Sequence, residues 1–318
     1  MPSHAIPKTI IPGLAKPVSR LVLGVDHQSS LDGAAPLLDA YVNAGGNCFD
    51  TAWIYKHGVC EKTLGQWLAA NNCRDEAVLL VKGAHTPYCS PEFAQTQLAE
   101  SLDRLGTTRA DIYMLHRDNP DIPAGEFVDW FAQVILSGHA AVCGVSNWTI
   151  ARIDEANAWA AKHGKPPIGA VSNQFSLARM ITPPWDGCVS VTDDAGRRYF
   201  EKNKVPLFSW SSQAHGFFAG FARPDQRDAN HLARHWYSYG NLRRLHRAEE
   251  LARRKSASAG AAISPVNIAL AYVLAQPFPI CSLIGPRTPA ELDRALPALG
   301  VELTEQERDW LDLRPDSP

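Results

Sequence analysis

Two kinds of hydrophobic pattern alternate along the chain. Short runs of apolar and β-branched residues, typical of buried strands, are separated by longer stretches in which apolar residues recur every three or four positions. The runs begin near Arg20, Asn47, Val78, Ala110, Ala141, Ala170, Pro206 and Ile280. Most neighbouring runs lie about 30 residues apart, which is the length of one strand–helix unit.

The stretches between the runs have the period of amphipathic helices. In Pro91–Leu105, the residues Phe93, Leu98, Leu102 and Leu105 form one apolar stripe that would pack on a sheet. The same pattern predicts helices over Thr149–His163, Asn241–Ser258 and Ser264–Gln276.

Eight strand–helix units predict an α/β fold, namely a (β/α)8 TIM barrel formed by residues 1–318 as a single domain. An open doubly wound sheet shares this alternation, but no G-x-G-x-x-G follows the first strand, where a dinucleotide-binding sheet would have it. The segment between Trp210 and Ile280 is too long for one unit. We therefore predict elaborated loops on the C-terminal face, with the Gly- and Phe-rich QAHGFFAGFARPDQRD over the barrel mouth.

Charge and cysteine content narrow the class of protein. The 318 residues include 31 Lys and Arg against 33 Asp and Glu, a balance that argues against a nucleic-acid partner. No apolar run approaches the ~18 residues of a membrane span, and the N-terminus lacks the apolar core of a signal peptide, so we expect no membrane partner. Seven scattered cysteines without a CxxC favour a reducing compartment. A cytoplasmic globular enzyme without a metal site is expected.

Four polar residues fall at or just after the ends of successive strands, where a barrel builds its active site. They are Asp50, Tyr55, Lys82 and His116. A Tyr hydroxyl with a pKa of about 10 is a poor acid–base group at neutral pH, and a nearby Lys82 ammonium would lower that pKa. Asp50 would hold the lysine, and His116 would polarise a carbonyl oxygen. Each residue alone has an ordinary structural explanation, but Lys82 ends the apolar run VLLV, where a buried ammonium needs a counter-charge.

The segment GGNCFDTAWIYKHGVCEKTLGQWL resembles the signature of the aldo/keto reductase superfamily. The likeness continues in order through VKGAH, DIYMLHRD, GVSNW, SNQFSL, FSWSSQAHGFFAG and LIGPRTPAEL, and so covers nearly the whole chain. The resemblance implies a (β/α)8 barrel that binds a nicotinamide cofactor without a Rossmann motif. It also implies that Asp50, Tyr55, Lys82 and His116 are the catalytic residues, with Tyr55 as general acid in carbonyl reduction.

The resemblance also implies the cofactor contacts. Ser146, Asn147 and Gln174 match the residues that hold the nicotinamide carboxamide, and Trp210 matches the aromatic residue on the nicotinamide face. The loop that folds over the pyrophosphate is matched by Ser211, Ser212, Gln213, Ala214 and Gly216. Gly285, Arg287 and Glu291 fall at the adenosine end, and Asp50 is a further cofactor contact. Arg287 could face an adenosine 2′-phosphate. The chain departs from the family pattern at Glu291 and Ala295, where Gln and Asn are usual, and a carboxylate would repel that phosphate. NADP(H) is favoured as the cofactor, and NAD(H) stays open.

Loop aromatics near the strand ends are the expected substrate contacts. These are Trp53, Tyr88 and Trp148, together with His116, while Trp185 and Phe217 could join them. The polar and aromatic loops suggest a small carbonyl compound, such as a sugar or polyol derivative. Two other functions remain open: a cofactor-binding sensor with slow turnover, and a lyase that forms a Schiff base on Lys82. The sequence also leaves a homo-oligomer open.

Overall fold

The computed structural model describes residues 5–222, 233–260 and 262–314. Within these residues, eight parallel strands form a closed barrel in the order β10-β3-β4-β5-β6-β7-β8-β9. The strands are β3 (Leu21–Gly24), β4 (Cys48–Ala52), β5 (Val78–Gly83), β6 (Ala110–Leu115), β7 (Ala140–Ser146), β8 (Ala170–Ser172), β9 (Leu207–Ser209) and β10 (Ile280–Ile284). Each begins within one residue of its predicted start, so the predicted (β/α)8 barrel is confirmed.

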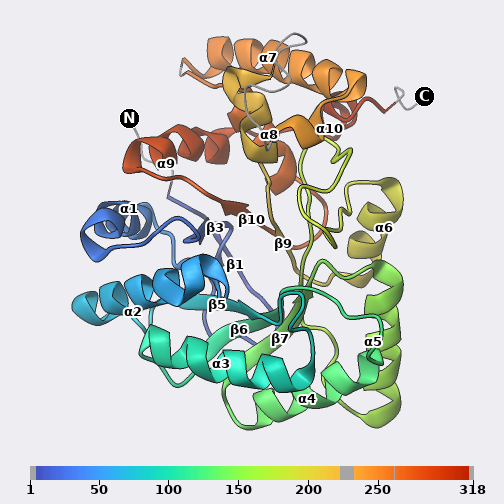
Figure 1. Ribbon diagram of the computed structural model, residues 1–318. Helices are drawn as coiled ribbons and strands as arrows, with labels where there is room; N and C mark the ends of the chain where they lie inside the picture. The colour runs from blue at the N-terminus through green and yellow to red at the C-terminus, as the bar shows by residue number, and fades with distance from the viewer. Residues whose placement is uncertain (1–4, 223–232, 261, 315–318) are drawn as a thin grey trace.

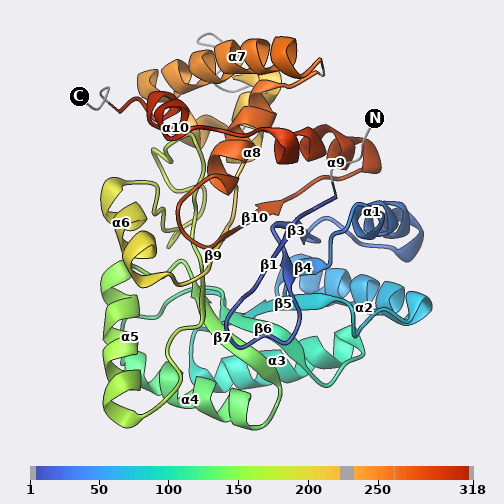
Figure 2. The same cartoon turned by 180° about the vertical axis from the view of Figure 1, so that it is seen from behind.

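Helices surround the strands, as Figures 1 and 2 show from opposite sides. They are α1 (Leu31–Asn43), α2 (Val59–Asn71), α3 (Pro91–Leu105), α4 (Ala124–Leu136), α5 (Ile150–His163), α6 (Asp194–Asn203), α7 (Tyr239–Ala259), α8 (Pro265–Leu274), α9 (Pro289–Ala295) and α10 (Glu305–Leu311). None of the helices in the described residues combines the length and apolar composition needed to cross a membrane.

Local sequence signals explain where the predicted helices begin and end. In α3, the Ser90 side chain accepts a hydrogen bond from the Phe93 amide, Pro91 occupies the first turn, and Gly106 ends the helix in the left-handed region. Thr149 caps α5 in the same way and Gly164 ends it. Short-range chemistry of this kind can be recognised in the sequence, which is why these boundaries were predictable.

Side chains on each strand alternate between two cores. The inner core fills the barrel and includes Val22, Cys48, Val78, Leu80, Ile112, Met114, Val142 and Phe208. The outer core lies between the strands and the helices and includes Leu21, Phe49, Leu79, Tyr113 and Leu207. A short antiparallel hairpin of β1 (Lys8–Thr9) and β2 (Val18–Ser19) precedes the first barrel strand. Its Ile11 and Val18 join the inner core and close the amino-terminal end of the barrel.

The long segment after β9 builds an outer layer on one side of the barrel. Helix α7 packs on α8 and α10, outside the ring of helices (Figure 1). The end of the segment predicted to cover the mouth falls in residues 223–232, outside the described residues.

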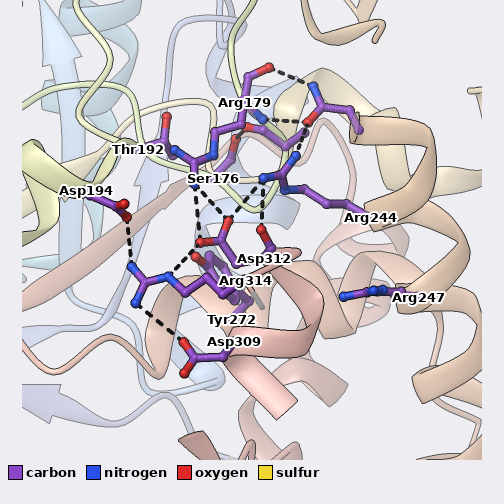
Figure 3. A network of polar contacts seen from close by, with 12 residues as sticks. Ser176, Arg179, Thr192, Asp194, Arg244, Arg247, Tyr272, Asp309, Asp312 and Arg314 are labelled. Carbon is purple, nitrogen blue, oxygen red and sulfur yellow. Dashed lines mark hydrogen bonds and ion pairs between the residues drawn. The ribbon is translucent and has the colours of Figure 1, made fainter. Parts of the chain in front are cut away.

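One buried carboxylate, Asp312, joins α10 to α6, α7 and the loop after β8 (Figure 3). It pairs with Arg179 at 3.1 Å, Arg197 at 2.7 Å and Arg244 at 3.3 Å. Residues far apart in the sequence therefore form ion pairs with the same carboxylate.

Candidate active site at the carboxyl ends of the strands

The alternation that fills the barrel also positions three of the four predicted catalytic side chains. The inward face runs from Cys48 to Asp50 on β4, from Val78 through Leu80 to Lys82 on β5, and from Ile112 through Met114 to His116 beyond β6. Because these strands are parallel neighbours, Asp50, Lys82 and His116 lie one layer above the apolar core at the same end of the barrel.

Asp50 and Lys82 form a buried ion pair, and each residue is only 3 % exposed. Burial raises the pKa of the Asp50 carboxyl, and the Lys82 ammonium offsets part of that rise. The Lys82 Nζ lies 5.3 Å from the centroid of the Tyr55 ring, over its face. The predicted triad of carboxylate, ammonium and phenol is thus brought together.

The structure corrects the expected ionisation of Tyr55. Desolvation of its hydroxyl, together with the negative charges of Asp50 and Asp26, raises the pKa of Tyr55 well above 10.0. Desolvation of the hydroxyl therefore outweighs the nearby Lys82 ammonium, so the pKa of this phenol is raised and not lowered in the free protein. Tyr55 is a neutral phenol at physiological pH.

His116 is the fourth of the predicted catalytic residues at this end of the barrel. Its ring centroid lies 5.8 Å from that of Tyr55 and 4.9 Å from that of His85, both edge-on. Burial and the charges of Lys82 and Arg117 hold the pKa of His116 well below 6.5. The imidazole is therefore neutral, and its buried Nδ1 has no hydrogen-bond partner in the part of the chain that the structure describes. A neutral ring with an unused nitrogen at the mouth can bind a polar atom of a ligand.

A second buried ion pair holds the loop that carries Tyr55. Arg104 Nη1 donates to Glu61 at 3.0 Å and to the Trp53 carbonyl oxygen at 3.2 Å. The loop turns at Gly58, where φ is +87° and a Cβ would lie 2.6 Å from the Arg104 guanidinium. Only glycine fits there without displacing Arg104. Backbone shape and charge together therefore fix the position of Tyr55.

The three residues predicted to hold the carboxamide lie around one loop. Asn147 Nδ2 donates to Ser146 Oγ at 3.0 Å, and its Oδ1 accepts from the Val189 amide at 3.2 Å. Gln174 accepts from Ser190 Oγ at 2.6 Å. All three predicted residues are buried. Their amide and hydroxyl groups are already ordered by protein contacts, so they present a preformed polar wall.

The predicted pyrophosphate loop follows β9. Trp210 is partly exposed, and its buried Nε1 has no hydrogen-bond partner among the described residues. Ser212 Oγ donates to the Leu283 carbonyl oxygen at 2.7 Å, which ties the loop to β10. Ser211 bonds His215, Gln213 and Gly216 are partly exposed, and Ala214 is fully buried.

The residues predicted at the adenosine end lie at the start of α9. Gly285 is exposed, and a Cβ there would meet nothing within 4 Å. Arg287 is exposed, and its backbone amide donates to the Glu291 carboxylate at 2.7 Å. Glu291 also lies 3.8 Å from Arg294. The Glu291 carboxylate is therefore engaged by its own helix terminus.

The predicted substrate aromatics divide into two groups. Trp53 and Tyr88 meet edge to face with ring centroids 6.5 Å apart, and Tyr88 is 45 % exposed, as expected of a rim. Trp148 is fully buried, with its Nε1 donating to the Arg117 carbonyl oxygen. Its position differs from the expectation, because Trp148 packs on Phe127 behind the mouth. Phe217 is likewise fully buried, whereas Trp185 is half exposed.

Two residues that the sequence analysis did not select also belong to this mouth. His85 lies against His116, and Arg117 is the buried residue that follows His116. Both occur within motifs quoted above, VKGAH and DIYMLHRD. The sequence held no sign of their burial, because both follow the ends of their strands, where alternation no longer applies.

Comparisons with known proteins agree with this geometry. The sequence model described as the aldo/keto reductase family matches residues 21–312. A putative aryl-alcohol dehydrogenase of Saccharomyces cerevisiae is 25 % identical over 302 residues, covering 88 % of this chain and 76 % of that protein. An aldo-keto reductase of Aspergillus calidoustus is 26 % identical over 303 residues, covering 88 % and 72 %. An aryl-alcohol dehydrogenase [NADP(+)] of Phanerodontia chrysosporium is 24 % identical over 308 residues, covering 87 % and 74 %.

Barrel, strand-end residues and family match together identify this chain as a member of the aldo/keto reductase family, an oxidoreductase that acts on carbonyl or alcohol groups with a nicotinamide cofactor.

Proposed function

We propose that the protein reversibly reduces a small aldehyde or ketone, with Tyr55 as the general acid. The observation that supports this most is the position of the Lys82 ammonium, paired with Asp50 and 5.3 Å from the centroid of the Tyr55 ring. A neutral phenol can donate a proton, and an adjacent ammonium stabilises the phenolate that remains.

The residues at the mouth have separate roles in this proposal. His116, neutral and edge-on to Tyr55, orients the carbonyl oxygen toward the phenol. Tyr55 protonates that oxygen as the carbonyl carbon is reduced, and Lys82 stabilises the resulting phenolate. Asp50 keeps the ammonium in place. Trp53 and Tyr88 exclude water at the rim.

A bound nicotinamide supplies the hydride, and this chain has residues that fit it. Trp210 offers a partly exposed ring at the end of β9 with an indole nitrogen that has no partner. We propose that the ring contacts the nicotinamide face, and that Ser146, Asn147 and Gln174 bind the carboxamide. Residues 211–216, Gly285 and Arg287 would hold the phosphates. We propose NADP(H) as the preferred form, supported by a relative whose name specifies NADP(+).

Glu291 is the reason to test NAD(H) beside NADP(H). Its carboxylate lies at the start of α9 next to Arg287, where it would repel a 2′-phosphate but accept a hydrogen bond from a ribose hydroxyl. A fluorescence titration with NADPH and NADH measures the preference. Tighter binding of NADH would overturn the proposed NADP(H) preference.

The direct test of the general acid is Tyr55→Phe, with Tyr88→Phe as the matched control. Tyr55→Phe is expected to lower kcat by at least about a hundredfold, the usual contribution of an acid–base group, while the Kd for NADPH stays within about twofold. Tyr88→Phe removes a hydroxyl from the rim and should leave kcat within about threefold. Full activity of Tyr55→Phe would refute the assignment of the acid.

The two alternative functions make different predictions. A Schiff-base lyase needs the Lys82 amine to attack a carbonyl carbon, and here that side chain is engaged in a buried ion pair with Asp50. A cofactor-binding sensor would bind NADPH and turn over negligibly across a panel of aldehydes. Steady NADPH oxidation with an aldehyde separates the proposed reductase from both.

We further propose a reducing compartment for this protein. All seven cysteines are free thiols, and five of them are buried.

A further inference from the structure

Arg117 differs from the other buried arginines of the described residues. Arg197 and Arg244, which are buried to a similar degree, both pair with Asp312. Arg117 is only 6 % exposed and forms no ion pair with any described residue. The neighbouring Asp118 is engaged by Arg152 at 3.2 Å. A buried guanidinium without a counter-charge is unfavourable, so its retention at a strand end indicates a ligand or a role in the site.

The hydrogen bonds that Arg117 forms with the described residues leave one edge of the guanidinium without a strong acceptor. Nη1 donates to the His116 carbonyl oxygen at 3.2 Å. Among the described residues, Nη2 contacts the Cys188 Sγ, a weak acceptor, at 3.6 Å, and the buried Nε has no partner. Nε and Nη2 form the side of the guanidinium that binds a carboxylate through two parallel hydrogen bonds.

Arg117 lies close to the side chains of the barrel mouth. Arg117 directly follows His116, whose ring lies 5.8 Å from that of Tyr55. The positive charge of Arg117 acts on the side chains of the mouth: it opposes the rise in the pKa of Tyr55 and lowers the pKa of both His116 and His85. A negative charge bound at Arg117 would therefore lie in the same site as the reacting carbonyl.

The loop residue beside Arg117 is a glycine, which has no side chain to cover the guanidinium. Gly187 is exposed with φ of +72°, and a Cβ there would lie 3.6 Å from the Arg117 side chain. The Cys188 thiol occupies the place of one acceptor on Nη2. A carboxylate oxygen is a far stronger acceptor for a guanidinium than a thiol, so it would displace the sulfur.

We infer that Arg117 binds the carboxylate of a carbonyl substrate, so that the preferred substrates are aldehydes or ketones that carry a carboxylate group. This inference rests on the proposed reductase function and specifies its substrate class.

The first experiment uses the wild-type protein and needs no variant. The 2-, 3- and 4-carboxybenzaldehydes are each compared with their own methyl ester by NADPH oxidation. Acid and ester share the ring and the reacting carbonyl and differ in charge. At least one isomer is expected to show kcat/KM about tenfold or more above its ester, the range of a charge-assisted bidentate contact. If every ester equals or exceeds its acid, the inference is wrong.

The second experiment removes the guanidinium. Arg117→Gln is expected to bring the ratio of kcat/KM for each acid to kcat/KM for its ester close to one, whatever the change in the rate of ester reduction itself. Arg109→Gln is the matched control, because Arg109 precedes the same strand β6 at the opposite end of the barrel and is exposed. It should keep the wild-type ratio. An unchanged ratio in Arg117→Gln would overturn the inference.

A binding measurement separates this inference from the proposed function. Benzoate, but not benzamide, is expected to raise the melting temperature of the wild-type protein, and Arg117→Gln should abolish that shift. If benzoate stabilises the protein but no aldehyde is reduced, the proposed function fails and the carboxylate site stands. If acids and esters are reduced equally and benzoate has no effect, the carboxylate site fails and the reductase stands.

Discussion

Asp312→Asn tests how much one buried carboxylate contributes to the stability of the barrel. The carboxylate is 3 % exposed and accepts from Arg179, Arg197 and Arg244, which come from three different segments (Figure 3). Removing its charge leaves Arg244 buried without a carboxylate. Arg197 keeps Asp194 at 2.9 Å, and an Asn can still accept one hydrogen bond.

The expected loss follows from the burial of the arginines. Breaking a buried ion pair by removing one partner costs about 3–5 kcal/mol. Because Arg197 keeps a partner, we expect the lower end, about 3 kcal/mol. At about 2–4 °C per kcal/mol for a chain of this size, the melting temperature falls by roughly 6–12 °C.

Asp309→Asn is the matched control. Asp309 lies three residues earlier and, within the described residues, pairs only with Arg314, at 3.5 Å, in a more exposed position. Asp309→Asn changes the net charge by the same amount as Asp312→Asn, but an exposed ion pair contributes at most about 1 kcal/mol to the free energy of unfolding. Urea unfolding and thermal melting of both variants measure the difference. If the two variants unfold within about 1 kcal/mol of each other, Asp312 does not organise the outer layer as described.

Two further predictions concern the site. Arg104→Met leaves the fully buried Glu61 without its cation and frees the Trp53 carbonyl, so the Tyr55 loop should shift and kcat/KM should fall about ten- to a hundredfold. Steady-state kinetics with Arg109→Met as an exposed control measure this, and wild-type rates would contradict it. The rate of reduction should be constant between pH 6.5 and 10, because the pKa of His116 lies well below 6.5 and that of Tyr55 well above 10.0. Protonation of His116 would lower the rate at more acidic pH, and ionisation of Tyr55 would lower it at more alkaline pH. A fall of kcat/KM between pH 7 and 9 would contradict these ionisation states.

Much of the fold followed from local patterns. The strand starts were predictable because apolar runs of buried parallel strands differ in length and period from the amphipathic helices between them. Asp50, Lys82 and His116 were predictable as strand-end residues, and period-two alternation then places them on the inward face with the core.

The remaining features depend on contacts that no local pattern encodes. The carboxylate of Asp312 pairs with Arg179, Arg197 and Arg244, and each of these arginines lies more than 60 residues before Asp312 in the sequence. The burial of Trp148 depends on how α4 and α5 pack, and the pKa of Tyr55 depends on desolvation as well as on charge. Arg117 was missed because only the folded chain shows that it is buried without a carboxylate.

The hairpin of β1 and β2 bears on the end of the barrel from which a ligand can approach the site. Because Ile11 and Val18 join the apolar inner core, packed side chains fill the amino-terminal end of the barrel. A ligand that contacts Asp50, Lys82 and His116 would therefore approach them from the carboxyl end of the strands, where these residues lie.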